Sequence, residues 1–258
     1  MNFKSALFGL MTILLISCGT EDVLTTRLLI KVIEDPTLYR DLYEYENGQL
    51  ISFKRYFGER EETNTQFHYL DNHLIKIEVK RDQGFEQIIE LKYGENGLRK
   101  EEKLTTIYNE VITYTRTGVF SYEDGVLKSI KYAFNDPNYI DPNYLPTETV
   151  FKWKNGNITK MEYYLFDGEY TYFTGTKTMT YDNKRNYSNQ DIAFIYTSGP
   201  GLETMISKNN VTSTTEFFGD TTIDRGSYKF TYNKDGYPDG YIYKVDSQEY
   251  NPIQISYE

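Results

Sequence analysis

A short motif recurs along this chain and constrains its fold more than any other feature. An aromatic or apolar residue, a polar residue and an aromatic are followed by Asn-Gly or a close substitute, and then by a second alternating run. The copies occupy residues 43–53, 67–77, 91–98, 120–130 and 151–158, with a degenerate copy at 179–183 and a last one at 230–238. Asn-Gly and Asp-Gly accept the positive φ angles of a type I′ turn. Each copy therefore predicts a β-hairpin.

The hairpins are expected to join into one sheet, because a lone hairpin is only marginally stable in water. The chain has 26 tyrosines and 15 phenylalanines, residues typical of strands. We predict an all-β fold, an antiparallel meander of consecutive hairpins with about 14 strands in one large twisted, curved sheet. Strand twist of roughly 20–25° per pair coils such a sheet, which stays open or closes partly into a barrel. A mean hydropathy of −0.62 favours this thin layer over a thick two-sheet sandwich.

One aromatic precedes each turn, and we call these the anchor aromatics: Tyr45, Tyr69, Tyr93, Tyr122, Trp153 and Tyr181. Two-residue alternation places them on one face of the sheet, and residues such as Glu44, His68 and Lys92 on the other. We predict that the first five of these, Tyr45 to Trp153, form the core, because cross-strand aromatic pairs stabilise a sheet. The alternative is an exposed platform that stacks on sugar rings.

The pattern Tyr-x-Tyr-x-Asn-Gly-x-Leu at residues 43–50 resembles two groups of proteins. One is the tyrosine-rich YD-repeat (Rhs-type) hairpin proteins, and the other is a class of uncharacterised Gram-negative lipoproteins built from consecutive hairpins. The second resemblance covers nearly the whole chain after the leader, and it includes Asp235-Gly236-Tyr237-Pro238 near the end. Seven units are too few for the cargo chamber of a long Rhs shell. The resemblance implies a β-sheet and a place in the cell envelope, but no known activity.

The amino-terminal residues read as a secretion signal. The apolar stretch from Ala6 to Ile16 is shorter than the roughly 18–20 residues of a membrane-spanning helix. It ends in Leu15-Ile16-Ser17-Cys18, and Cys18 is the only cysteine. This order resembles the lipobox of bacterial lipoproteins, which implies cleavage before Cys18 and acylation of its sulfur. We predict a signal peptide at 1–17, a lipidated tether at 18–26 and one hairpin-repeat domain at 27–258. The alternative is an ordinary leader with an incidental cysteine.

The residues after Cys18 indicate the membrane to which the protein is sorted. Gly19 stands where many inner-membrane lipoproteins have aspartate, so we predict the outer membrane. Glu21 and Asp22 resemble the acidic signal that some Gram-negative lineages read for display on the cell surface. Cell-surface display is the expectation, with the periplasmic face of the membrane as the alternative.

The charge balance excludes one class of partner. The formal net charge is −10, and residues 1–17 contain Lys4 and no acidic residue, so cleavage makes the chain more negative. A polyanion is repelled by such a protein, and we predict no nucleic-acid partner. The predicted partners are the membrane, through the lipid on Cys18, and a protein or glycan.

The residues offer little for catalysis, and we predict no catalytic residue, no cofactor and no enzyme activity. His68 and His73 lie on a hairpin without a nucleophile nearby, and zinc needs more such ligands. Acidic pairs for glycoside hydrolysis exist in principle, but chance pairs are expected among 38 acidic residues. The pairs considered are Glu61 with Glu62, Glu101 with Glu102, and Asp220 with Asp224.

The strongest metal candidate is the loop at 135–144. Asp136, Asn138, Asp141 and Asn143 carry hard oxygen donors that suit calcium. Their spacing departs from the known calcium loop, because Asp141 stands where the sharp-turn glycine belongs. We therefore predict a surface loop and no metal site, with calcium as the alternative.

Three functions remain. The first is a noncatalytic lipid-anchored envelope protein that acts as a binding or scaffold module. The second is a glycan-binding lipoprotein of a polysaccharide uptake system, and the third is a hydrolase of unrecognised type. An exposed aromatic row would favour the second, and a cleft with two facing carboxylates the third.

Overall fold

The computed structural model describes residues 29–134, 147–166, 169–187, 193, 196–197, 206–219 and 221–257. These residues form one antiparallel sheet of seventeen strands with one short 3-10 helix, η1 (Asp82–Gly84). The strands are β1 (Ile30–Asp35), β2 (Tyr39–Glu46), β3 (Gln49–Phe57), β4 (Arg60–Leu70), β5 (His73–Arg81), β6 (Phe85–Tyr93), β7 (Arg99–Tyr108), β8 (Val111–Glu123), β9 (Val126–Phe134), β10 (Glu148–Lys154), β11 (Asn157–Phe166), β12 (Thr171–Arg185), β13 (Asn209–Phe218), β14 (Thr221–Tyr232), β15 (Pro238–Val245), β16 (Gln248–Glu249) and β17 (Ile253–Tyr257).

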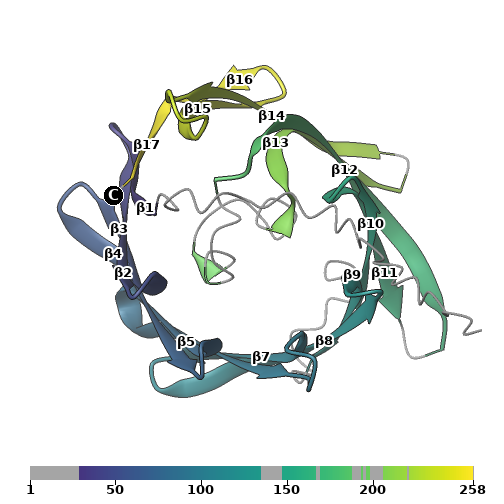
Figure 1. The fold of residues 1–258 in the computed structure, drawn as a ribbon. Coiled ribbons are helices and arrows are strands. Elements are labelled where there is room, and N and C mark those ends of the chain that lie inside the picture. Colours follow the sequence, from purple (N-terminus) through teal and green to yellow (C-terminus); the bar gives the residue numbers. More distant parts are fainter. Residues whose placement is uncertain are drawn as a thin grey trace, which may run out of the picture.

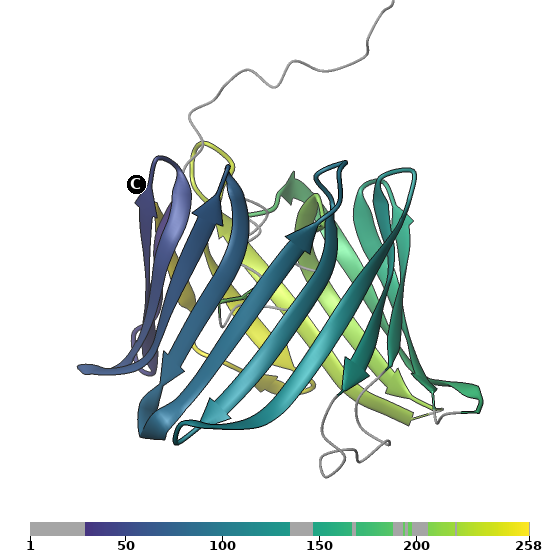
Figure 2. The same cartoon turned by 90° about the horizontal axis from the view of Figure 1, so that it is seen from below.

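The sheet closes into a barrel (Figures 1 and 2). Strand β1 pairs with β2 on one side and with β17 on the other, and β17 also pairs with β15. Sixteen strands thus form the ring, while the two-residue β16 pairs with β15 outside that series. The all-β meander of hairpins is confirmed. The strand number exceeds the expected value of about 14, because the first and last strands belong to no Asn-Gly hairpin.

The two ends of the barrel differ in their turns. The first rim carries the Asn-Gly type turns, among them 47–48, 71–72, 124–125 and 155–156. Asn47 and Gly48 both have positive φ, at 50° and 77°, as a type I′ turn requires. The second rim carries the intervening turns, such as 36–38 and 109–110. The described chain enters at the first rim, where Ile30 pairs with Tyr257.

Each first-rim hairpin contains a β-bulge next to its turn. Tyr45 pairs with Leu50, and the register then shifts so that Glu44 pairs with Ser52. The same shift follows the anchor pairs Tyr69–Leu74, Tyr122–Leu127 and Trp153–Ile158. A bulge interrupts the ladder and leaves backbone groups without their usual strand partners.

The next anchor aromatic along the barrel supplies the missing partner. Tyr69 donates its hydroxyl to the Leu50 carbonyl at 2.9 Å, and Tyr93 donates to Leu74 at 2.9 Å. Trp153 Nε1 donates to Leu127 at 2.7 Å, and the Tyr181 hydroxyl donates to Ile158. At the end of the series, the Tyr257 hydroxyl donates to the Pro238 carbonyl at 2.6 Å. This ladder explains why the motif uses tyrosine or tryptophan rather than phenylalanine at the anchor position.

Two buried clusters line the inside of the barrel. One, centred on Phe53, Leu74 and Ile77, is lined by the anchors Tyr45, Tyr69 and Tyr93. The other, centred on Phe151 and Ile158, is lined by Tyr122, Trp153 and Tyr181. All six anchors pack against buried residues and are themselves partly buried. The core assignment of the first five anchors is confirmed, and Tyr181 shares it.

The ladder predicts a measurable role for a single hydroxyl. Tyr69→Phe removes the donor to Leu50, and we expect it to lower the free energy of unfolding by about 0.5–1.5 kcal/mol. Tyr108→Phe, at a position 47% exposed on the second rim, is the matched control with little expected change. Chemical denaturation of both variants checks this. Equal stability of Tyr69→Phe and the parent would refute a structural role for the ladder.

Candidate functional site: the barrel wall and its interior cavity

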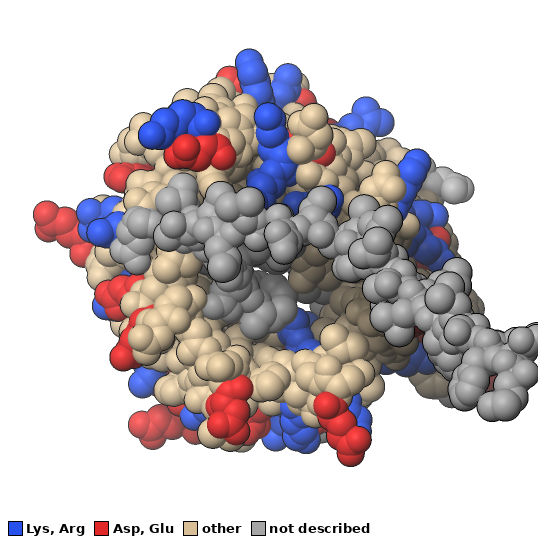
Figure 3. Space-filling view, in the orientation of Figure 1, with Lys and Arg blue, Asp and Glu red and all other residues tan. Residues whose placement is uncertain are grey.

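The outer wall of the barrel carries rows of ion pairs. Lys92 Nζ lies 2.6 Å from Glu101 Oε1 on adjacent strands, and Lys152 Nζ lies 3.4 Å from Glu162 Oε2. Further pairs across the wall are Lys54–Glu44, Lys80–Glu86, Lys103–Glu90 and Lys131–Glu148. Figure 3 shows acidic and basic side chains projecting outward around the ring, with a hollow at its centre. The wall from β2 to β11 is therefore strongly polar.

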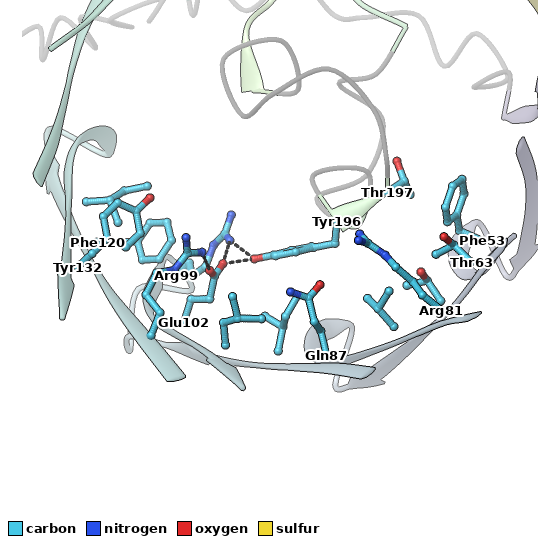
Figure 4. A pocket seen from close by; sticks show the side chains of 16 residues that line it. Phe53, Thr63, Arg81, Gln87, Arg99, Glu102, Phe120, Tyr132, Tyr196 and Thr197 are labelled. Atoms are coloured by element: carbon cyan, nitrogen blue, oxygen red, sulfur yellow. Dashed lines mark hydrogen bonds and ion pairs between the residues drawn. The ribbon is translucent and has the colours of Figure 1, made fainter. Parts of the chain in front are cut away.

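Inside the barrel, beside the first cluster, lies a cavity of about 310 Å³. Strands β3 to β9 form its wall, and Tyr196 and Thr197, from the connection between β12 and β13, lie against it (Figure 4). Its lining mixes apolar rings, such as Phe53 and Phe120, with charged side chains. A barrel of this strand number is wide enough to hold such a space.

A buried charged cluster occupies one side of the cavity. Glu102 is 7% exposed and Arg99 is 8% exposed. Arg99 Nη1 lies 3.3 Å from Glu102 Oε2, and Arg116 Nη2 lies 3.1 Å from Glu102 Oε1. Tyr196 donates its hydroxyl to Glu102 at 2.6 Å and also contacts Arg99. One carboxylate thus holds two guanidinium groups and a phenol.

Aromatic rings complete the surroundings of the two arginines. The Arg99 guanidinium carbon lies 4.5 Å from the centroid of the Phe120 ring. That of Arg116 lies 4.8 Å from the centroid of Tyr132. Both distances are within the range of cation–π attraction, which is strongest where water is excluded.

Strand alternation explains why these side chains face inward. Glu101 and Glu102 are neighbours on β7, so Glu101 faces the outer wall and pairs with Lys92, while Glu102 faces the cavity. The two carboxylates of this pair therefore point away from each other and cannot flank one sugar. Glu61 accepts hydrogen bonds from Tyr56 and Asn64 at an exposed position.

Burial controls the ionisation of the phenols in the cavity. It raises the pKa of Tyr196 well above its ordinary value, because the charged form loses hydration. Burial likewise raises the pKa of Tyr132. Both phenols therefore stay protonated at neutral pH, and Tyr196 donates its proton in the hydrogen bond to Glu102.

A second ion pair lies on the same inner face. Arg55 contacts both carboxylate oxygens of Asp41 at 2.6 Å and covers the ring of Tyr39 at 4.5 Å. Burial raises the pKa of Asp41, and the guanidinium of Arg55 opposes that rise. This pair is bidentate and internally neutral, so it adds rigidity without adding net charge.

Arg81 is the third arginine of the cavity lining, and it is exposed. Figure 4 places it across the cavity from Arg99, on the other side of Tyr196. Its guanidinium lies 5.3 Å from the ring of Phe85. Among the described residues that line the cavity, three arginines face one carboxylate, Glu102. The cavity of this acidic protein is therefore positively charged.

The other residues singled out in the sequence lie elsewhere. His68 is on the outer wall, with Nε2 3.1 Å from Glu78, and His73 is exposed beside the ring of Tyr93. Cys18, loop residues 135–144 and Asp220 lie outside the described residues, as does the side chain of Asp224. Within the described part of the chain, no group of three or more His, Cys, Asp or Glu side chains could hold a metal ion.

Among the residues with a described position, no helix is long and apolar enough to cross a membrane.

The cavity residues were missed at the sequence level, although a signal for some of them is present. Arg116 is an even number of residues from Phe120 and the anchor Tyr122, so strand alternation places it on the same face as they are. Arg81 lies in the same way on the face of Ile77 and Val79. A charged residue on an otherwise apolar face indicates a buried polar site. Nothing in the sequence near Tyr196 shows that it meets Glu102.

None of the protein-family models matches the sequence, and no curated protein matches it either. Solved structures do. A porin-like protein from Bacteroides vulgatus matches with a TM-score of 0.56 and 11% identity, over 90% of this chain and 99% of the other. The chain has the same fold as that protein. A porin-like protein from Bacteroides uniformis matches with a TM-score of 0.49 and 15% identity, over 90% and 95% of the two chains.

At 11% identity the likeness to the Bacteroides vulgatus protein extends to the fold alone. It supports the closed barrel and the order of its hairpins. The resemblance to lipoproteins and to YD repeats, which rests on the motif and on Cys18, stays a prediction.

Proposed function

We propose that this chain is a noncatalytic protein of the outer membrane, anchored by lipid on Cys18, whose barrel lies in water beside the membrane. The barrel acts as a binding module that uses its interior and its second rim. The porin-like fold is in keeping with an outer-membrane address. It does not require that the barrel span the bilayer, because fold and function separate readily.

The polar outer wall is the observation that carries this proposal. A barrel that spans a membrane presents an apolar band about 25 Å tall to the lipid, and a lysine at the bilayer midplane costs roughly 2–4 kcal/mol. Here Lys76 and Lys103 project from near the middle of β5 and β7, each in an ion pair. The buried apolar clusters lie on the inner face instead. This arrangement suits a barrel surrounded by water.

The test is to express the full chain and its Cys18→Ser variant in a Gram-negative host fed with radiolabelled palmitate. We expect label and membrane fractionation for the parent chain, and neither for the variant, which should appear in the aqueous fraction without detergent. Ser17→Ala, which keeps the cysteine, is the matched control and should stay with the membrane. Protease treatment of intact cells then separates surface display from the periplasmic face.

Two outcomes would contradict the proposal. A parent chain that takes up no label would show that Cys18 carries no lipid anchor. A Cys18→Ser variant that resists extraction from membranes by carbonate would show that the barrel wall itself enters the bilayer, as in a true porin.

Glycan binding is the second candidate function, and the second rim favours it. Nearly all exposed large apolar side chains of the described residues lie near this rim, with Leu70, Val119 and Val126 as the exceptions. Phe166, Tyr170, Tyr172 and Phe173 form its densest part, at the β11–β12 hairpin, each about half exposed. Aromatic faces of this kind stack on sugar rings. Unchanged affinity for a panel of oligosaccharides in Tyr172→Ala and Phe173→Ala would eliminate this candidate.

A further inference from the structure

We propose that the interior cavity binds a small organic acid, a carboxylate with an apolar or aromatic body. The proposal concerns the cavity alone and does not depend on the lipid anchor or on the side of the membrane. Charge, unpartnered donors and shape support it independently.

The first support is the excess of positive charge. Arg81, Arg99 and Arg116 line the cavity, and Glu102 is the carboxylate among its described lining residues. Glu102 already serves Arg99 and Arg116 together, so its charge is shared between two cations. An anion that entered the cavity would meet the guanidinium of Arg81, which makes no ion pair with a described carboxylate.

The second support is a set of buried donors without partners. Thr65 is 0% exposed, and its hydroxyl makes no hydrogen bond within the described structure. The Nε atoms of Arg99 and Arg116 are buried and equally unpartnered. Native proteins rarely leave buried polar groups unpaired, because each costs free energy. All three residues line the same cavity, and a carboxylate bound there would offer the acceptor oxygens that they lack once their side chains turn toward it.

The third support is the arrangement of Thr65 and Arg81. On adjacent strands Thr63 pairs with Arg81, and Thr65 pairs with Val79, so Thr65 and Arg81 are diagonal neighbours on the inner face. Diagonal neighbours lie roughly 7–8 Å apart, a separation that one carboxylate can bridge with its two oxygens. Arg81 is exposed while Thr65 is buried, which orders them from the cavity mouth inward.

The walls define the rest of the ligand. Rings of Phe53, Phe120, Tyr132 and Tyr196 line the cavity together with aliphatic side chains. A volume of about 310 Å³ is at the small end of natural ligand pockets, which run from roughly 300 to 1,000 Å³. The cavity therefore fits a compact acid rather than a chain of sugars or a long acyl group.

Isothermal titration of the purified protein with benzoate and naphthoate, and with the uncharged amides of both, tests the proposal. We expect a carboxylate to bind at least about tenfold more tightly than its amide, since each tenfold step is 1.4 kcal/mol. Arg81→Gln should lose most of this preference. Arg60→Gln, an arginine 70% exposed and paired with Asp82 outside the cavity, is the matched control and should keep it.

Thr65→Val gives a readout that a purely structural role would not produce. Because the hydroxyl is buried and unpartnered, its isosteric removal should raise the melting temperature while it weakens carboxylate binding. Failure of both carboxylates to bind the folded protein, equal binding of acids and amides, or full affinity in Arg81→Gln would each overturn the proposal. A Thr65→Val variant that melts lower than the parent would show that the hydroxyl is already satisfied.

Discussion

Replacement of Glu102 by Gln is expected to lower the free energy of unfolding by about 3–5 kcal/mol, the usual cost of breaking a buried ion pair on one side only. The variant keeps the size of the side chain and removes its charge. Arg99 and Arg116, which share this carboxylate, are then left in the interior with no counterion from the residues that contact them here. Urea denaturation followed by circular dichroism, with each unfolding curve fitted to a two-state model, measures the change.

Glu101→Gln is the matched control, one residue away on the same strand. Glu101 pairs with Lys92 on the outer wall, where water screens the interaction and the pair contributes little. We expect a much smaller change than for Glu102→Gln. Equal effects of the two substitutions would show that the inner cluster is as hydrated as the wall, and would also weaken the electrostatic basis of the cavity proposal.

The hairpins could be predicted because their signal is local. Asn47-Gly48 fixes a turn by its own φ angles, and alternation on both sides fixes which residues face inward. Barrel closure could not be predicted in the same way. It depends on the pairing of β1 with β17, two strands at opposite ends of the sequence, and no turn motif records that contact.

The anchor ladder lies between these extremes. Inward-facing aromatics at one register position were predictable as core. Their hydrogen bonds were not, because each runs to a carbonyl at a bulge in the preceding hairpin, as from Tyr69 to Leu50. Bulges depend on sheet twist and on neighbouring strands, and the motif does not reveal them.

The cavity shows the same limit in a stronger form. Glu102 and Tyr196 are hydrogen bonded although 94 residues separate them in the chain. His68, His73 and the loop at 135–144 were the candidates in the sequence because those residue types are common in functional sites. The interior cluster instead uses arginine, glutamate and tyrosine on strands, where each taken alone resembles an ordinary surface residue. Arg99, Glu102 and Arg116 meet on the paired strands β7 and β8, and only the fold of the barrel brings Tyr196 to them.

The outer wall decides how the porin-like fold should be interpreted. Closed barrels in lipid and in water can share strand order and differ only in which face is apolar. In this chain the ion pairs lie outside, and the buried clusters lie inside. This arrangement is the basis on which we propose that the barrel lies beside the membrane.

The interior also explains the second large effect, expected for Phe151→Ala. Phe151 is 2% exposed and packs in the second cluster with Phe120 and Ile130. Its truncation is expected to cost about 3–5 kcal/mol, as for other buried phenylalanines. The position matters further because β9 and β10 are joined by three register pairs, Lys131–Glu148, Ile130–Thr149 and Ser129–Val150. Phe151 is the next residue of β10 after these pairs, and its buried side chain stabilises the short β9–β10 seam from inside the barrel.

Phe166→Ala, on the neighbouring strand β11 and 51% exposed, is the matched control and should change stability little. Denaturant unfolding compares the two, and amide hydrogen exchange locates the damage. If the seam depends on Phe151, protection should fall first in β9 and β10 and remain in β4 to β7. Uniform loss of protection around the ring would instead mean that the barrel unfolds as one cooperative unit, with no weak seam between β9 and β10.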